Sequence, residues 1–154
     1  MNYRNFGKTG WEVSEIGYGM WGMGGWKGSD DTQSERSLDL AVEQGVTFFD
    51  TAWGYGEGHS ERLLGKLIRR HPDRKLYAAS KIPPKNFKWP AKPTYSFEES
   101  YPAAHIREYT EKTLKNLVMD RIDLMQFHTW DDTRASREEW QRTVEDLKKE
   151  GKVA

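Results

Sequence analysis

The chain has 154 residues, of which 36% are apolar, 31% are charged and 14 are glycine. This balance is typical of a globular protein of one domain and excludes wholesale disorder. The 24 basic and 24 acidic residues cancel, so the basic surplus of a nucleic-acid-binding protein is missing. The absence of cysteine excludes disulfides, thiolate metal sites and cysteine nucleophiles. We find neither a signal peptide nor a membrane-spanning segment, and therefore expect a soluble cytoplasmic protein.

The first residues predict a β-hairpin. Residues 3–6 and 11–13 are strand-like, and Gly7 and Gly10 flank the turn between them. After this hairpin (residues 1–13), the chain repeats one unit four times over residues 14–154, an apolar strand followed by an amphipathic helix. The predicted strands are a segment that ends at Gly19 and residues 46–52, 75–82 and 121–129.

The four predicted helices carry core-facing residues at helical spacing. These are Leu38, Ala41 and Val42 in the first, Leu63, Leu64, Leu67 and Ile68 in the second, Ile106, Tyr109, Thr113, Leu114 and Leu117 in the third, and Trp140, Val144 and Leu147 in the fourth. Capping-box patterns predict that the first helix begins at residues 32–35 and the fourth at residues 136–139. Gly45 and Gly151 are placed to end these two helices.

Alternating strands and helices predict βαβ units and a parallel sheet, because each helix supplies the crossover that a parallel connection needs. The glycines of the first loop do not match the GxGxxG spacing of a dinucleotide-binding turn, which favours a barrel over a doubly wound sheet. A complete barrel of eight units needs about 250 residues. We therefore expect an α/β fold of the (β/α)8 TIM-barrel type. Residues 1–154 would supply only its N-terminal hairpin and first four βα units, with a fifth strand starting at residues 151–154.

Three predicted strands carry a polar side chain at their carboxyl ends: Asp50, Lys81 and His128. Strand alternation places each on one face with apolar residues, as at the mouth of a barrel where an active site is found. Tyr55 follows in a glycine-rich loop. A phenol is a poor acid at neutral pH, but a neighbouring ammonium favours its ionised form and a carboxylate keeps that ammonium charged. Such a phenol can protonate an oxygen, which suits the reduction of a carbonyl by hydride.

The residues around these positions resemble the aldo-keto reductase family. The resemblance lies in residues 48–61 (FFDTAWGYGEGHSE), in Ser80-Lys81 at the end of the third strand, and in residues 121–128 (RIDLMQFH), and it covers the chain in the right order. It implies a (β/α)8 barrel that reduces aldehydes or ketones with a nicotinamide cofactor, usually NADPH, although NADH is possible.

The resemblance also implies roles for single residues. Tyr55 would be the proton donor of a catalytic tetrad, with Lys81 beside it to make the phenol more acidic. Asp50 would pair with Lys81, and His128 would orient the carbonyl. Gly19, Met20 and Trp21 match the loop near the nicotinamide, so they and Asp50 are the expected cofactor contacts. The family's later phosphate-binding loops have no counterpart in this sequence. We therefore expect a truncated chain that carries the catalytic half of the barrel, and the resemblance does not decide whether this chain is active alone.

A long segment, residues 82–102, holds five of the six prolines and five aromatic residues. It leaves the strand that ends at Lys81 and is either a flap over the substrate or a packed insertion. Four tryptophans follow the four strands and are the expected rim of a substrate pocket for ring-bearing or apolar molecules: Trp21, Trp53, Trp89 and Trp130. The alternative is that they pack the loops, which is the better interpretation for Trp11 and Trp140.

The other histidines, His59, His71 and His105, show no metal-ligand spacing, so no metal site is expected. The main hypothesis is an NADP(H)-dependent oxidoreductase acting on a small carbonyl substrate, with no nucleic-acid or membrane partner. The alternative is a non-catalytic half-barrel that serves as an assembly or binding module. Its open sheet edges would pair with a second copy or with the missing C-terminal half. A barrel lyase that uses Lys81 and Asp50 fits less well, because it leaves Tyr55 without a role.

Overall fold

A computed structural model describes residues 1–26 and 28–154. The chain begins with the expected hairpin, in which β1 (Tyr3–Asn5) pairs antiparallel with β2 (Glu12–Ser14). The turn between them contains Gly7 and Gly10, both with positive φ angles, of 55° and 77°. Glycine adopts this left-handed backbone without steric cost, which allows the tight reversal.

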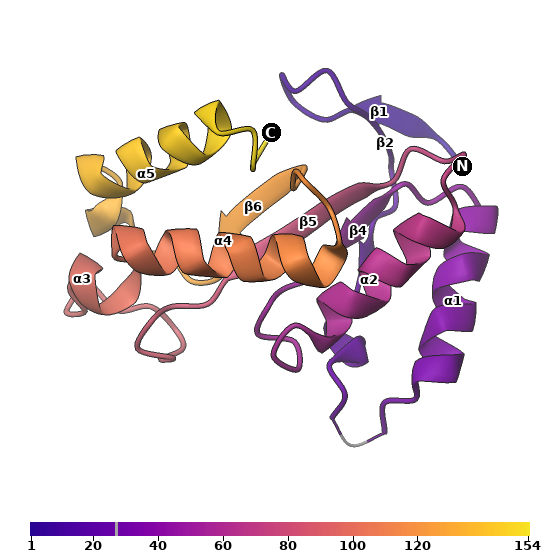
Figure 1. Ribbon diagram of the computed structural model, residues 1–154, viewed down its shortest axis with the longest axis horizontal. Helices are drawn as coiled ribbons and strands as arrows, with labels where there is room; N and C mark the ends of the chain where they lie inside the picture. The colour runs from indigo at the N-terminus through magenta and orange to yellow at the C-terminus, as the bar shows by residue number, and fades with distance from the viewer. Residues whose placement is uncertain (27) are drawn as a thin grey trace.

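A parallel sheet forms the centre of the fold (Figure 1). Its strands, in spatial order, are β3 (Tyr18–Gly19), β4 (Phe48–Asp50), β5 (Tyr77–Ile82) and β6 (Leu124–Phe127). Each strand pairs parallel with the next along the chain. Beyond β6, Val153 forms a parallel bridge with Ile122, where the sequence predicted that a fifth strand starts.

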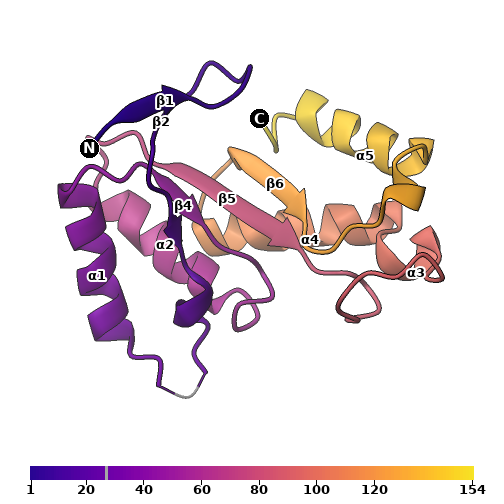
Figure 2. The same ribbon diagram turned by 180° about the vertical axis from the view of Figure 1, so that it is seen from behind.

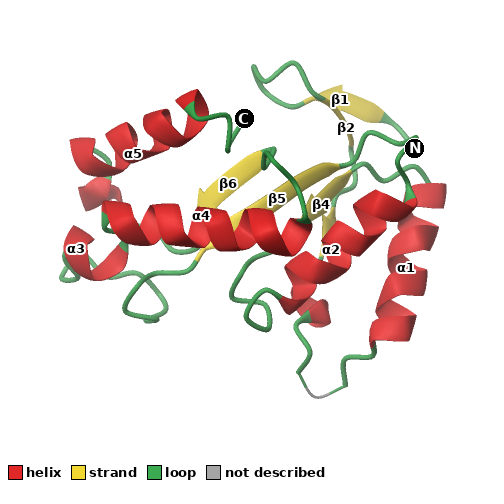
Figure 3. Cartoon of the chain, in the orientation of Figure 1, coloured by secondary structure: helices red, strands yellow, loops and turns green. Residues whose placement is uncertain are grey.

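Helices cover one face of this sheet. They are α1 (Asp31–Glu43), α2 (His59–Arg70) and α4 (Ala103–Leu117), while α5 (Glu138–Lys149) lies beyond β6 (Figures 1 and 3). A short helix, α3 (Phe97–Ser100), and two 3-10 turns, η1 (Trp21–Met23) and η2 (Asp132–Arg134), lie in the loops. The view from behind shows the opposite face of the sheet with no helix over it (Figure 2). This is one wall of a (β/α)8 barrel, seen from its inner side.

The core lies between the sheet and its helices. Residues of the predicted helix faces are fully buried against the outward side chains of the strands, among them Leu38, Leu63, Leu64, Leu67, Ile106, Leu117 and Leu147. Each such side chain stabilises the fold by about 1.5–3 kcal/mol relative to an exposed one. Ile68, Trp140 and Val144 are only partly buried, because they lie at the margins of their helix faces.

The hairpin covers the amino end of the open face. The Phe6 ring stacks on Phe48 with 5.3 Å between centroids, and Trp11 stacks on Tyr77 at 5.2 Å. Trp11 therefore packs the structure, as predicted. Because these rings cover the amino end of the inner face, the open part of that face lies at the carboxyl ends of the strands.

Both predicted capping boxes are wrong. Helix α1 begins at Asp31, and its N-cap is Asp30, whose Oδ1 accepts a hydrogen bond from the Gln33 backbone at 2.7 Å. An aspartate caps as well as a threonine does, and it stands two residues earlier. The N-cap of α5 is Arg137, which makes no side-chain cap bond. The predicted glycine ends are confirmed, since Gly45 and Gly151 follow α1 and α5 with φ angles of 91° and 76°.

A capping box does occur in the long loop, at the start of α3. Ser96 Oγ accepts a bond from the Glu99 backbone, and Glu99 Oε2 accepts one from the Ser96 backbone. Of the helices described, none is long and apolar enough to cross a membrane. The cytoplasmic location stays a prediction.

Candidate active site

The carboxyl ends of β4, β5 and β6 lie side by side, and they bring Asp50 and Lys81 together on the inner face. Lys81 Nζ donates to Asp50 Oδ2 at 2.6 Å and to the Thr51 carbonyl at 2.7 Å. The side chain of Lys81 is 15% exposed and that of Asp50 is 37% exposed. The ammonium is therefore largely removed from water but has a carboxylate partner, which a buried charge needs.

Gln126 of β6 completes the contacts of Asp50. Its Nε2 atom donates to Asp50 Oδ1 at 3.3 Å, so both oxygens of the carboxylate have partners. Gln126 precedes His128 by two residues, so strand alternation places both on one face, but no role was predicted for Gln126. Its strand alternation and polar side chain were the signal that could have identified it.

Tyr55 reaches the pair from the loop that follows β4. Its backbone closes a turn onto the Ala52 carbonyl at 3.0 Å. Lys81 Nζ lies 5.2 Å from the centre of the Tyr55 ring. The same ring meets His128 edge to face, with 5.6 Å between centroids and an interplanar angle of 82°. The structure thus gathers all four residues of the predicted tetrad; their catalytic roles stay a prediction.

The surroundings of the His128 ring disfavour its charged form. Its backbone N–H donates to the Ile82 carbonyl, and its Nδ1 atom is buried without a hydrogen-bond partner in the described part of the chain. Burial lowers the pKa of the imidazole, and the charge of Lys81 lowers it further, against a smaller opposite effect of Asp50. These effects favour the neutral imidazole, whose ring nitrogens can hydrogen-bond to a polar ligand atom.

Two tryptophans lie against the tetrad. Trp89 meets the His128 ring at 5.9 Å, and Trp26 meets the Tyr55 ring at 6.3 Å, both nearly edge to face. Trp21, which is 66% exposed, lies 5.4 Å from Trp26. The sequence did not point to Trp26. Its ring folds back over Gly24, two residues earlier, where an added Cβ would lie only 2.4 Å from the ring.

The structure does not bring the other two rim tryptophans to Tyr55. Trp53 packs edge to face on Tyr109 of α4 at 4.7 Å. Trp130 stacks on Phe127 at 5.5 Å and meets Trp140 of α5 at 5.4 Å. Phe127 precedes His128 in sequence, so strand alternation turns it, and Trp130 with it, towards the helices. Trp140 packs, as predicted.

The residues expected to contact the cofactor at the end of β3 differ in their solvent exposure. Gly19 is exposed, and a Cβ at that position would have no atom within 4 Å. Met20 is fully buried and contributes its side chain to the core, while its backbone N–H donates to the Asp50 carbonyl at 2.9 Å. Gly19 and Trp21 therefore offer open surface at the end of β3, and the Met20 side chain does not.

The long loop between β5 and α4 is packed, and it also reaches the site. At its base, the Pro83 carbonyl lies 2.8 Å from His105 Nε2, and Tyr101 hydrogen-bonds to Thr129. In its middle, Arg134 Nη2 donates to the Tyr95 carbonyl at 3.2 Å. The packed alternative is therefore confirmed, and Trp89 of this segment lies against His128; a flap over the substrate stays a prediction.

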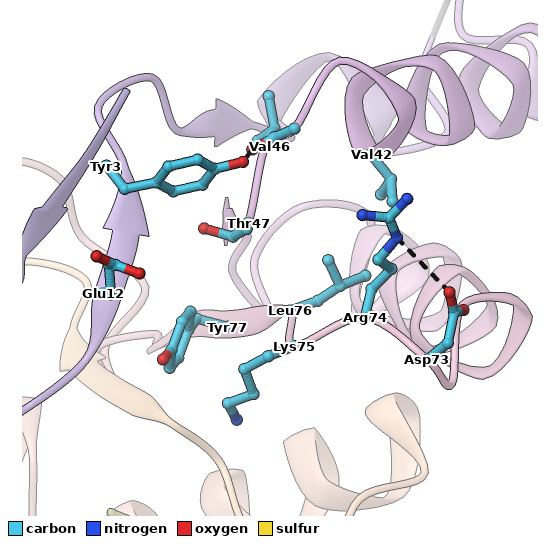
Figure 4. A pocket seen from close by; sticks show the side chains of 11 residues that line it. Tyr3, Glu12, Val42, Val46, Thr47, Asp73, Arg74, Lys75, Leu76 and Tyr77 are labelled. Carbon is cyan, nitrogen blue, oxygen red and sulfur yellow. Dashed lines mark hydrogen bonds and ion pairs between the residues drawn. The ribbon is translucent and has the colours of Figure 1, made fainter. Parts of the chain in front are cut away.

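The opposite end of the sheet has a hollow of about 340 Å³, lined by residues of the hairpin and of the loops before β4 and β5 (Figure 4). Tyr3, Thr47 and Arg74 are among its walls, and no residue of the predicted site is. In barrels of this type, active sites lie at the carboxyl ends of the strands. Across residues 1–26 and 28–154, no group of three or more acidic or histidine side chains is arranged to hold a metal ion.

Comparisons with known proteins agree with this geometry. The model of the Aldo/keto reductase family matches residues 15–154. Among curated proteins, the chain is 35% identical over 156 residues to "Aldo-keto reductase YhdN" of Bacillus subtilis, covering 99% of this chain and 45% of that protein. It is 34% identical over 152 residues to "Probable aldo-keto reductase 1" of Glycine max, covering 96% and 41%. The chain thus spans somewhat less than half the length of these curated relatives.

A solved structure, the holo form of aldo-keto reductase AKR11C1 from Bacillus halodurans, superposes with a TM-score of 0.79 at 28% identity. This match covers 99% of the present chain and 48% of that structure. The matched length, the parallel half-barrel and the agreement of independent comparisons establish the family. The chain belongs to the aldo/keto reductase family.

Proposed function

We propose that this chain carries the proton-donating side of an NADP(H)-dependent active site that reduces aldehydes or ketones. The observation that carries the proposal is the position of Lys81. Its ammonium is bonded to Asp50 at 2.6 Å and lies 5.2 Å from the ring centre of Tyr55. A fixed positive charge beside a phenol stabilises the phenolate that remains when the proton has left.

Each member of the tetrad then has one task. Tyr55 donates its proton to the carbonyl oxygen as that oxygen gains negative charge. Lys81 favours the resulting phenolate, and Asp50 keeps the lysine charged and in place. His128, neutral at physiological pH, orients the carbonyl oxygen through a hydrogen bond. Because burial and Lys81 both lower the pKa of His128, the ring does not compete with Tyr55 as the acid.

A nicotinamide cofactor fits the exposed end of β3. Gly19 has no side chain, and an added Cβ would meet no atom, so a planar ring can approach the backbone there. Trp21 is exposed on the same segment, and Asp50 pairs in register with Gly19. When bound, the reduced cofactor supplies a hydride to the carbonyl carbon. Gly19, Trp21 and Asp50 would hold its nicotinamide end.

The substrate class follows from the aromatic walls. Trp89 lies against His128 and Trp26 lies against Tyr55, so a carbonyl at the tetrad has indole rings on two sides. Such surfaces favour apolar or ring-bearing molecules. We therefore infer an aldehyde or ketone with an apolar or aromatic substituent.

The direct test is the Tyr55→Phe variant of the full-length protein, assayed with NADPH and 4-nitrobenzaldehyde. Loss of the proton donor should lower turnover by about 10²–10⁴-fold. Tyr3→Phe is the matched control, because Tyr3 lies in the hairpin and its hydroxyl bonds to the Gly45 carbonyl. Equal rates for Tyr55→Phe and the wild type would refute the assignment.

An assembly module is the second candidate, and the open sheet favours it. Strand β3 and the segment at Val153 are the two ends of the sheet, and no helix in the described part of the chain lies over the inner face (Figure 2). Unpaired strand edges can pair with another chain. Sedimentation equilibrium of residues 1–154 separates the two cases: a stable monomer would count against pairing through the edges.

A further inference from the structure

Glu61 is a buried carboxylate outside the tetrad. It lies in the first turn of α2 and is fully buried. Its Oε1 atom accepts hydrogen bonds from Ser80 Oγ at 2.6 Å and Thr113 Oγ1 at 2.8 Å, and its Oε2 atom accepts one from Asn116 Nδ2 at 2.7 Å. Burial raises the pKa of this carboxyl group, and the three bonds oppose that effect. Burying a carboxylate is costly, and the bonds that offset the cost join α2 to β5 and α4.

The neighbouring residue of α2 makes a parallel connection. Ser60 Oγ accepts a bond from Thr51 Oγ1 at 2.8 Å and donates to the Met20 carbonyl at 3.1 Å. Thr51, Ser60 and Ser80 are all fully buried. One helical turn is thus bonded to the ends of β3, β4 and β5.

Strand alternation links these bonds to the site. Ser80 precedes Lys81 in β5 and points to the helix layer, so Lys81 points to the inner face. Thr51 follows Asp50 in the same manner, and its carbonyl accepts the second bond of Lys81 Nζ. A helix turn that fixes Ser80 and Thr51 on the outer side therefore fixes Lys81 and Asp50 on the inner side.

Helices α2 and α4 are packed closely at this contact. A Cβ on Gly65 of α2 would lie 2.6 Å from the Leu117 carbonyl oxygen of α4, and a Cβ on Gly58 would lie 2.1 Å from Asn116 Nδ2. Glycine at both positions lets α2 approach α4 until Asn116 reaches Glu61. The Glu61 carboxylate is thus bonded to α4 through Thr113 and Asn116, and to β5 through Ser80.

We propose that Glu61 is a positioning residue, which fixes Lys81 against Asp50 and beside His128 through its bond to Ser80. The proposal deepens the proposed function, on which its catalytic meaning rests. The geometric part of the proposal is that these bonds fix the position of the Lys81 ammonium. That position can be tested without an activity assay, because the Lys81 charge lowers the pKa of the His128 imidazole.

The experiment is a pH titration of the His128 imidazole by ¹H–¹³C NMR in the full-length protein, with the signal assigned by its loss in His128→Asn. Ser80→Ala removes the bond between Glu61 and β5. A displaced Lys81 acts more weakly on His128, so the midpoint should rise by about 0.3 pH units. Thr113→Val is the matched control, because it removes a bond to the same Oε1 atom but from α4. It should shift the midpoint by less than Ser80→Ala does, because the Ser80 bond remains and Asn116 still holds the carboxylate from α4.

Two further variants complete the design. Glu61→Gln keeps an acceptor oxygen for Ser80 and should keep the wild-type midpoint. If Ser80→Ala does not fold, Ser80→Cys, with its weaker donor, takes its place and should shift the midpoint in the same direction. An unchanged midpoint in a folded Ser80 variant, or an equal shift in Thr113→Val, overturns the proposal. Loss of turnover in Tyr55→Phe does not enter this test, so the two proposals fail separately.

Discussion

Lys81 and His128 lie at the carboxyl ends of neighbouring parallel strands, and the positive charge of Lys81 adds to burial in lowering the pKa of the His128 imidazole. Asp50 acts on the ring in the opposite direction, but less strongly. Asp50 therefore pairs with the ammonium at 2.6 Å, while the combined effect of the surroundings still lowers the pKa of the imidazole. The site has one fixed cation beside Tyr55 and one neutral ring that can orient a ligand.

The first prediction concerns the two charges that act on His128. Lys81→Met removes the cation, so the His128 titration midpoint should rise, whereas Asp50→Asn removes the opposing anion and should lower it. Lys81→Met should also reduce carbonyl turnover by about 10²–10⁴-fold, since the phenolate loses its stabilising charge. NMR titration and a steady-state assay with 4-nitrobenzaldehyde measure the two effects.

Lys85→Met is the control for that experiment. The charge of Lys85 lowers the pKa of His105, after the larger effect of burial. Its removal should raise the His105 midpoint and leave that of His128 in place. If Lys81→Met and Asp50→Asn shifted the His128 titration midpoint in the same direction, the opposite effects of Lys81 and Asp50 on the imidazole would be contradicted.

The second prediction concerns stability against pH. Burial lowers the pKa of both His105 and His128 in the folded chain, so the unfolded chain binds more protons just below the usual histidine pKa. Their contribution to stability is present above that pKa and is lost as the pH falls through the folded-state values. The free energy of unfolding in urea should therefore fall between pH 7.5 and pH 5.5. His105→Gln, which keeps a donor for the Pro83 carbonyl, should reduce this fall; an unchanged fall would contradict the prediction.

The order of elements was predicted from the sequence because strands and helices alternate along the chain. The gathering of the tetrad was predicted because side chains alternate between the two faces of each strand. Asp50, Lys81 and His128 each end a strand, and parallel strands bring their carboxyl ends to one edge. The aromatic surroundings were harder to predict. Strand alternation sends Trp130 to the helix side with Phe127. The Trp26 ring, which meets Tyr55, lies over Gly24, where a side chain would clash with it.

Local sequence patterns also did not determine where the helices start or which polar side chains make buried contacts. Asp30 and Thr32 are both good caps, and the sequence does not tell which is used until the helix is packed. Glu61 looks like an exposed residue of an early helical turn. Its burial depends on Thr113 and Asn116, which lie more than 50 positions later in the chain. Such contacts are a property of the tertiary fold.

The third prediction separates the two kinds of tryptophan. Trp89 lies edge to face with His128, so Trp89→Leu should raise the KM for 4-nitrobenzaldehyde about 2–10-fold, the value of one aromatic contact. The KM for a small aliphatic aldehyde should change less. Trp130→Leu is the control, since Trp130 packs on Phe127 and Trp140 away from Tyr55. Equal effects of the two substitutions would contradict a substrate surface at Trp89.

The last prediction concerns Gly65, where α2 approaches α4. Alanine favours a helix by up to about 1 kcal/mol over glycine. Here, however, the added Cβ would lie 2.6 Å from the Leu117 carbonyl oxygen, a backbone atom that cannot turn away. Overpacking costs about 1–3 kcal/mol, so Gly65→Ala should lower the free energy of unfolding in urea. Gly22→Ala, with no atom within 4 Å of its Cβ, should change it by less than about 0.5 kcal/mol. A gain in stability for Gly65→Ala would show that the helices can separate there.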